Sequence, residues 1–187
     1  MPREGEGRAA VFLDRDGVLN EAVVRDGRPF APASLSELVV LPEAPSACRS
    51  LRNEGFLLIV VTNQPELARG TLDAGTLEAL HGELSSRLSL DAIYVCPHDD
   101  RDRCPCRKPA PGLLLRAAVE QGIDLGRSFL VGDRWRDIEA GQRAGCRTIF
   151  IDRGYLEPRP VGADAEVHDM AEAAAWIRVA GKEVPVG

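Results

Sequence analysis

Short, almost continuous apolar runs recur along the chain and alternate with segments of helical periodicity. Most of them lack the polar–apolar alternation of a strand with one face in water. Such strands are covered on both faces, which is typical of a parallel sheet between two layers of helices. The predicted strands are residues 10–13, 57–62, 92–96, 128–131 and 147–151.

Helices are predicted between these strands at residues 43–53, 74–88, 111–121 and 138–144, with a final amphipathic helix at 170–179. Gly55, Gly122 and Gly145 follow three of them, where a left-handed residue commonly ends a helix. Residues 154–162 contain two prolines and are predicted to form a loop. We therefore expect an α/β, Rossmann-like fold, with a mostly parallel sheet and helices on both faces. The 187 residues suit one domain, 1–187.

Composition excludes several classes of protein. Hydrophobic residues make up 44% of the chain and charged residues 28%, as in soluble globular proteins. The net charge of −6 argues against a general nucleic-acid surface. No apolar run approaches the ~20 residues that cross a bilayer, and residues 1–8 lack the apolar region of a signal peptide. We expect a cytoplasmic protein that binds neither nucleic acid nor membrane.

Polar side chains gather where the predicted strands end. Asp14 and Asp16 follow the first strand, Thr62 and Asn63 end the second, and Asp133 follows the fourth. In an open parallel sheet the ligand lies beyond the carboxyl ends of the strands. These side chains, distant in sequence, are therefore expected to meet in one crevice.

Two carboxylates lie two positions apart in the segment Asp14-Arg15-Asp16-Gly17. They would repel each other unless a cation lies between them, and a hard cation with oxygen ligands, most naturally Mg²⁺, meets that need. One carboxylate can then attack phosphorus while its neighbour handles the proton. The alternative is a solvated loop at a strand end, where Asp-x-Asp-Gly is common.

Two further strand ends carry groups suited to a phosphate or a metal. Thr62, Asn63 and Gln64 can donate hydrogen bonds to phosphate oxygens, although a strand end that caps the next helix is equally consistent. Gly132 allows a tight turn, so that Asp133 would complete the carboxylate set of the metal. Asp137 either supports that set from behind or only caps a helix.

Three cysteines and a histidine cluster at Cys96, His98, Cys104 and Cys106. Five cysteines are too few, and odd in number, for a disulfide scaffold. A Cys₃His set matches a closed, structural Zn²⁺ site, which would hold the polar loop 96–108 in shape. The alternative is a chance cluster of reduced thiols.

Arg107 and Lys108 follow the last thiol directly and are flanked by prolines. A zinc-stabilised loop would fix both cations where they can hold a phosphate, Arg107 as a fork and Lys108 as a point charge. The alternative is a solvated basic turn before a helix.

In this order, the motifs resemble those of the haloacid dehalogenase (HAD) superfamily of aspartate-nucleophile phosphatases, over residues 10–151. The resemblance implies that Asp14 forms an aspartyl-phosphate and that Asp16 protonates the leaving alkoxide and then activates water. Mg²⁺ would be held by the Asp14 carboxylate, the Asp16 backbone carbonyl and Asp133. Thr62 and Lys108 would bind the phosphoryl oxygens. The further substrate-binding candidates are Arg15, Asn63, Gln64, Arg69, Arg107 and Arg134.

The zinc loop and Cys-Arg-Lys-Pro are similar to the branch that contains the heptose-bisphosphate and histidinol-phosphate phosphatases. The spacing of the motifs leaves no room for a large cap domain, so the zinc loop is expected to shield the cleft. Ala68-Arg69-Gly70 and the segment 108–114 resemble the heptose enzymes, whereas the short zinc loop resembles the histidinol enzymes. Two segments depart from the heptose pattern: Pro65-Glu66-Leu67 replaces Ser-Gly-Ile, and residues 22–25 replace Asp-His-Gly-Tyr.

We expect a small phosphorylated sugar, most naturally a heptose bisphosphate, as substrate, with histidinol phosphate as the alternative. A zinc-stabilised binding module without catalysis is the alternative from another class. The intact Asp14, Asp16, Lys108 and Asp133 argue against it, because a binding module needs no nucleophile. A DNA-end phosphatase uses the same chemistry, but the acidic charge argues against it.

Overall fold

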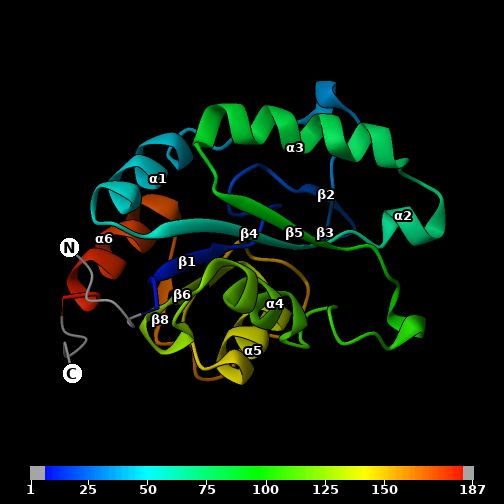
Figure 1. The fold of residues 1–187 in the computed structure, drawn as a ribbon. Helices are drawn as coiled ribbons and strands as arrows, with labels where there is room; N and C mark the ends of the chain where they lie inside the picture. The colour runs from blue at the N-terminus through cyan, green and yellow to red at the C-terminus, as the bar shows by residue number, and fades with distance from the viewer. Residues whose placement is uncertain (1–6, 183–187) are drawn as a thin grey trace.

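The computed structural model describes residues 7–182 and contains a six-stranded sheet in which every pair of neighbouring strands is parallel (Figure 1). The spatial order is β5-β4-β1-β6-β7-β8. The chain starts in the middle at β1, runs outward to β4 and β5, and returns to the other side of β1 with β6. The strands are β1 (Ala10–Leu13), β4 (Leu57–Asn63), β5 (Ala92–Cys96), β6 (Phe129–Gly132), β7 (Arg147–Ile151) and β8 (Ala165–Val167).

Helices cover both faces of the sheet (Figure 1). On one side lie α1 (Ala44–Asn53), α3 (Ala74–Leu88) and α6 (Met170–Ala180), and on the other α4 (Gly112–Gln121) and α5 (Trp135–Ala144). Val11 and Leu13 of β1 enter the core on the first side, whereas Ala10 and Phe12 enter the core on the second. All four are fully buried. Because successive strand residues point to opposite faces, burial on both sides produces the continuous apolar runs of the sequence.

The predicted α/β fold is confirmed, with shifts at the ends of elements. Strand β4 continues to Asn63, and α5 begins at Trp135 rather than at 138. Helix α5 starts earlier because the Asp137 carboxylate accepts the backbone N–H of Arg134 at 3.1 Å and caps the first turn. The predicted loop 154–162 contains no helix or strand, and most of segment 1–8 lies outside the described residues. The unpredicted elements are the strands β2, β3 and β8, the short helix α2 (Glu66–Arg69), and the 3₁₀ turns Leu35–Glu37, Asp100–Asp102 and Leu125–Arg127.

A small hairpin, β2 (Val23–Arg25) and β3 (Arg28–Phe30), stands apart from the main sheet. Its two-residue turn, Asp26-Gly27, has φ values of 50° and 72°, as in type I′ turns. Leu156, in the loop that follows β7, donates its backbone N–H to the Gly27 carbonyl at 2.7 Å. A Cβ at Gly27 would lie 2.5 Å from Cγ of Leu156. The hairpin is thus pressed against the loop after β7.

Within residues 7–182, no helix is both long enough and apolar enough to cross a membrane.

Candidate active site

A cavity of about 450 Å³ opens at the carboxyl ends of β1 and β4, beside the point where the strand order reverses. The hairpin, α2, the zinc loop, the start of α5 and the loop after β7 contribute its walls. The predicted site residues that line it are Asp14, Asp16, Thr62, Asn63, Arg69, Arg107, Lys108 and Arg134. Arg15, Gln64 and Asp133 do not line it.

Lys108 and Asp14 form the floor of the cavity. The Lys108 Nζ donates to Asp14 Oδ1 at 2.7 Å and to the Val61 carbonyl at 2.7 Å, and it lies 2.6 Å from Asp137 Oδ1. The side chain of Lys108 is 2% exposed. Burial acts to lower the pKa of Lys108, but Asp137 and Asp14 outweigh it, so the pKa is raised and the ammonium stays charged. Burial raises the pKa of Asp14 to about 6, against the opposing effect of Lys108.

Three buried carboxylates, Asp14, Asp133 and Asp137, have ligand oxygens within 4.8 Å of one another. Both oxygens of Asp133 are buried without a close hydrogen-bond partner among the described residues, although the neighbouring Tyr155 hydroxyl acts to lower the pKa of Asp133. Burial, reinforced by Asp14 and Asp137, raises the pKa of Asp133 well above its usual range. Gly17 has a φ of +86°, and a Cβ there would lie 1.8 Å from Asp133 Oδ2, so the close approach requires glycine. Unpartnered carboxylate oxygens around one point fit a hard divalent cation such as Mg²⁺.

Asp16 lies in the wall of the cavity and accepts hydrogen bonds from three side chains. Arg15 and Gln64 lie behind it, and both are fully buried. Arg15 donates to Asp16 through Nε at 3.0 Å and Nη2 at 2.9 Å, and Gln64 donates through Nε2 at 3.1 Å. Asn20 donates the remaining bond at 2.9 Å. Two predicted substrate contacts, Arg15 and Gln64, are therefore turned toward Asp16 rather than into the cavity.

Asn63 and Thr62 are likewise bound to other site residues. The Asn63 side chain accepts the backbone N–H of Lys108 and donates to the Lys108 carbonyl, each at 3.1 Å. This pair of bonds joins the end of β4 to the loop that carries Lys108. Thr62 accepts a hydrogen bond from Gln64 Nε2 at 2.9 Å and is 1% exposed.

The four cations predicted from sequence to surround the ligand, Arg69, Arg107, Lys108 and Arg134, do meet in the cavity wall. Each already has a carboxylate partner: Arg69 pairs with Asp99 at 2.5 Å, Arg107 with Asp100 at 2.8 Å, and Arg134 with Glu157 at 2.5 Å. Among the described residues, six basic and six acidic side chains line the cavity. Acidic side chains from neighbouring loops therefore balance the charge of these cations.

Sequence reasoning missed several lining residues, among them Arg28, Phe30, Arg136 and Leu156. Arg28 and Phe30 lie on the hairpin, whose Asp-Gly turn between two short valine- and arginine-containing segments was the available signal. Arg136 lies in the first turn of α5, three residues after Asp133. Arg28 differs from the other lining cations, since no described residue forms an ion pair or side-chain hydrogen bond with its guanidinium.

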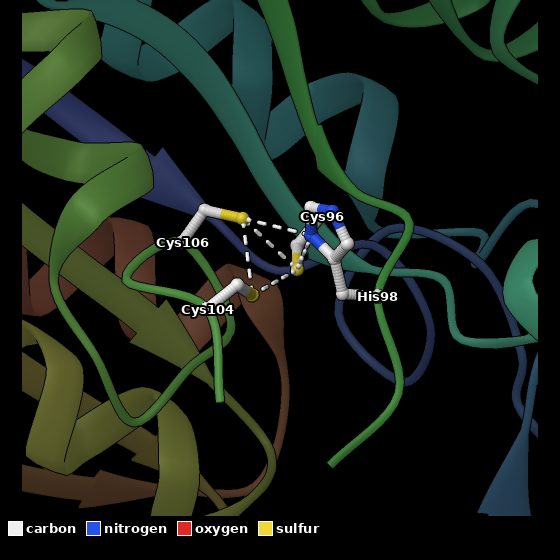
Figure 2. A group of neighbouring side chains, drawn as sticks. All are labelled: Cys96, His98, Cys104 and Cys106. Atoms are coloured by element: carbon white, nitrogen blue, oxygen red, sulfur yellow. Dashed lines mark hydrogen bonds between the residues drawn. The ribbon is translucent and has the colours of Figure 1, made fainter. Parts of the chain in front are cut away.

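The predicted zinc ligands Cys96, His98, Cys104 and Cys106 converge on one point (Figure 2). The three Sγ–Sγ separations are 3.2, 3.3 and 3.5 Å, and His98 Nδ1 lies 3.3 Å from Cys106 Sγ and 3.6 Å from Cys96 Sγ. Ligands of a tetrahedral zinc lie about 3.5–3.8 Å apart. The observed separations are equal to or slightly shorter than this spacing, so the four side chains could surround one Zn²⁺ and would leave no position for water.

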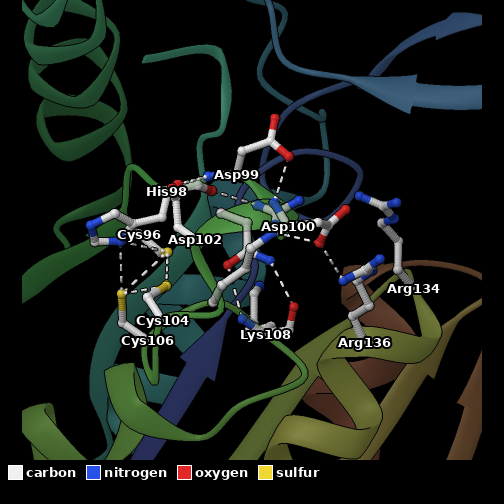
Figure 3. A network of polar contacts seen from close by, with 12 residues as sticks. Cys96, His98, Asp99, Asp100, Asp102, Cys104, Cys106, Lys108, Arg134 and Arg136 are labelled. Atoms are coloured by element: carbon white, nitrogen blue, oxygen red, sulfur yellow. Dashed lines mark hydrogen bonds and ion pairs between the residues drawn. The ribbon is translucent and has the colours of Figure 1, made fainter. Parts of the chain in front are cut away.

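The zinc loop is tied to the cavity wall through its acidic residues (Figure 3). Asp99 binds Arg69 at the end of α2, while one oxygen of Asp100 binds both Arg107 and Arg136, at 2.8 and 3.0 Å. Asp102 accepts the backbone N–H of Asp99 at 2.7 Å and closes the short turn between them. The loop thus reaches from the thiol cluster to the arginines of the cavity.

The chain is similar to known hydrolases of the HAD class. A family model described as HAD-hydrolase-like matches residues 105–175. The D-glycero-beta-D-manno-heptose-1,7-bisphosphate 7-phosphatase of Bordetella bronchiseptica is 37% identical over 149 residues, covering 77% of this chain and 80% of the relative. That of Escherichia coli (strain K12) is 35% identical over 180 residues, covering 90% and 87%.

Solved structures agree with these sequence matches. The D,D-heptose 1,7-bisphosphate phosphatase of B. bronchiseptica, complexed with magnesium and phosphate, superposes with a TM-score of 0.80 at 33% identity, covering 92% of this chain and 99% of that one. A putative HAD-like phosphatase from Mesorhizobium loti gives a TM-score of 0.76 at 27% identity, covering 96% and 90%.

Fold and site together define an HAD-like hydrolase, with its carboxylates at the switch point of a parallel sheet. The chain belongs to the HAD superfamily of phosphatases, in the family that contains these heptose-bisphosphate phosphatases.

Proposed function

We propose that this protein is a Mg²⁺-dependent phosphatase that removes the 7-phosphate of D-glycero-D-manno-heptose 1,7-bisphosphate and leaves the heptose 1-phosphate. The observation that carries the proposal is the cavity floor, where Asp14, Asp137 and Lys108 meet, with the buried Asp133 carboxylate within 4.8 Å of the two aspartates. The relatives named for this reaction align over 77–90% of the chain. We propose further that residues 1–187 act as one catalytic domain, with the zinc loop as an insertion.

Asp14 is the nucleophile in this mechanism. Its carboxylate lies at the cavity floor, 7% exposed, where a phosphoryl group can approach. An Asp14 oxygen forms the new bond to phosphorus while the bond from phosphorus to the sugar oxygen breaks, which gives an aspartyl-phosphate. The Lys108 ammonium stabilises the negative charge of Asp14 and, like Thr62, lines the part of the cavity where the transferred phosphoryl group would bind.

Asp16 carries the proton in both halves of the reaction. It gives a proton to the leaving sugar oxygen, which departs as a neutral hydroxyl group. It then takes a proton from the water that attacks the aspartyl-phosphate, so that inorganic phosphate leaves, the Asp14 carboxylate is regenerated and Asp16 is again protonated. Its 15% exposed side chain lies in the cavity wall, as this role requires.

The Asp14 carboxylate, the Asp133 carboxylate and the Asp16 backbone carbonyl would hold Mg²⁺. When bound, the ion neutralises the carboxylates and lowers the energy of the charge that develops on the phosphoryl oxygens. Asp137 supports this set indirectly, because it fixes both Lys108 and the first turn of α5. Cys96, His98, Cys104 and Cys106 would hold a structural Zn²⁺, which keeps the loop carrying Arg107 and Lys108 in shape.

The second phosphate of the substrate would be anchored in the wall of the cavity. A volume of about 450 Å³ suits a phosphorylated sugar. Three of the lining arginines already form ion pairs with carboxylates of the protein, namely Arg69, Arg107 and Arg134. Arg28 has no such partner among the described residues. It can therefore bind a phosphate of the substrate without breaking an existing ion pair.

Glu66 favours a second candidate function, histidinol-phosphate hydrolysis. It lines the cavity from α2, and its Oε2 is buried with no hydrogen-bond partner among the described residues. A carboxylate in this position could receive the ammonium group of histidinol phosphate. The departure Pro65-Glu66-Leu67 from the heptose pattern is what places it there.

A side-by-side assay separates the two functions. The kcat/KM for heptose 1,7-bisphosphate should exceed that for histidinol phosphate, and EDTA should abolish both activities until Mg²⁺ is returned. Preference for histidinol phosphate, lost in Glu66→Gln, would overturn the first assignment in favour of the second. Hydrolysis of neither compound by protein loaded with Mg²⁺ would contradict both.

A further inference from the structure

Arg15 is fully buried and donates hydrogen bonds to Asp16 from the side of Asp16 that faces away from the cavity. Its guanidinium makes a two-pronged contact with Asp16, through Nε at 3.0 Å and Nη2 at 2.9 Å. Nη2 also donates to Gln64 Oε1 at 3.0 Å. Such a fork fixes the plane of the carboxylate as well as its position. The orientation of Asp16 therefore depends on what holds Arg15.

His81 of α3 holds the far side of that guanidinium. Its Nε2 lies 3.0 Å from Arg15 Nη1 and accepts a hydrogen bond from it. Burial, together with the charge of Arg15, lowers the pKa of His81 to about 4, so the ring is neutral and able to accept at neutral pH. Asp16 and His81 thus clamp the two edges of Arg15, and helix α3 is connected to the proton-transfer group.

We propose that His81, acting through Arg15, is a positioning residue that sets the orientation of Asp16 for proton transfer to the leaving group. The proposal rests on the phosphatase function proposed above. Losing the acceptor on His81 would leave one Arg15 N–H buried without a partner, so the guanidinium would turn away to find another. The fork on Asp16 would then open.

The test compares leaving groups. An alkoxide needs a proton to leave, whereas p-nitrophenolate leaves without one, so poor positioning of Asp16 affects kcat/KM for the sugar phosphate and spares p-nitrophenyl phosphate. His81→Leu keeps the volume and removes the acceptor. It should lower kcat/KM for the sugar bisphosphate by about 10- to 100-fold, the range for groups that orient an active-site ligand from behind, and change kcat/KM for p-nitrophenyl phosphate far less.

Two further variants separate positioning from stability. His81→Gln, which retains an acceptor, should recover much of the lost activity. Leu88→Ala removes a buried side chain from the same helix, about two turns away from His81. It should lower Tm while leaving the ratio of the two kcat/KM values at the wild-type level. If His81→Leu does not fold, His81→Ala provides the same comparison.

Equal losses on both substrates in His81→Leu, or no loss on either, would overturn the inference. A crystal structure of the variant gives a readout that needs no turnover: the Asp16 carboxylate should be rotated, and an unmoved Arg15–Asp16 pair would also overturn it. Wild-type protein inactive on both substrates would instead contradict the proposed function, and the crystal structure would still decide the role of His81.

Discussion

The ammonium of Lys108 has three acceptors and no spare donor, since Asp14, Asp137 and the Val61 carbonyl take one hydrogen each. A buried cation with such partners neutralises a site that would otherwise hold several like charges. Asp14 is consequently held ready at the cavity floor, between the Lys108 ammonium and the unpartnered oxygens of Asp133. Because the proposed chemistry depends on single carboxylate and ammonium groups, substitutions that change only one of these atoms should have large effects on turnover.

Asp14→Asn tests the nucleophile directly. An amide keeps the shape of the side chain but cannot attack phosphorus, so turnover should fall to background while the fold remains. The measurements are phosphate release at saturating substrate and a far-UV spectrum with Tm. Asp91→Asn, at a partly exposed ion pair remote from the cavity, is the matched control and should retain activity. Substantial turnover by Asp14→Asn would exclude the aspartyl-phosphate mechanism.

At the scale of elements, the cavity is assembled from short pieces that surround the sheet. The zinc loop reaches Arg69 and Arg136 through Asp99 and Asp100, and the hairpin is held by Leu156. Neither piece has a core of its own. A bound metal would shape the zinc loop, and the Asp26-Gly27 turn shapes the hairpin. Each should therefore be separable from the sheet by mutation.

Removing two thiols should loosen the zinc loop. Cys104→Ser with Cys106→Ser should abolish the binding of about one zinc per chain, and it should lower Tm and weaken catalysis because Arg107 and Lys108 lose their anchor. Metal analysis, thermal melting and steady-state kinetics measure the three effects. Cys146→Ser, at a buried thiol outside the cluster, is the control for thiol loss itself and should retain zinc. Normal kinetics and Tm in a zinc-free double variant would show that the metal has no structural role.

The hairpin should contribute to substrate choice through Arg28. Arg28→Ala should raise KM for a bisphosphate more than it lowers kcat, because the anchoring contact is equally strong in ground and transition states. A monophosphate substrate should be almost unaffected. Arg25→Ala changes the neighbouring cation on the same hairpin, which stacks on Phe30 and does not line the cavity, and should leave both KM values unchanged. An equal rise for the two substrates would refute the assignment.

At the scale of the whole molecule, the central position of β1 between β4 and β6 brings the two halves of the chain to one site. Asp14 follows β1, Lys108 comes from the loop before α4, and Asp133 and Asp137 follow β6. The carboxylates repel one another in the absence of a cation, so the fold bears an electrostatic cost at its centre. Binding of Mg²⁺ to the folded state alone would then stabilise the entire domain.

Asp133→Asn should separate stability from metal binding. Without metal, removal of one buried charge should raise Tm by about 2–4 °C for each kcal/mol of repulsion relieved. The wild-type Tm should rise when Mg²⁺ is added, whereas that of Asp133→Asn should respond weakly, and activity should be lost. Thermal melting of EDTA-treated protein with and without Mg²⁺ measures this. A lower Tm of the metal-free variant would show that Asp133 forms favourable contacts beyond those described.

The sequence by itself determined the parallel sheet, the five strands that form its body, the thiol cluster and the strand ends that carry Asp14, Thr62 and Asp133. These features depend on local periodicity and on the spacing of residues along the chain, so they are readable without contacts. The hairpin and β8 escaped prediction because three-residue strands carry almost no periodic signal. Only the tertiary structure decided that Arg15 and Gln64 support Asp16 from behind and that carboxylates from Asp99, Asp100 and Glu157 offset the arginines. Such partners come from distant segments, and which side of a residue faces the cavity depends on the packing of elements that the sequence does not place relative to one another.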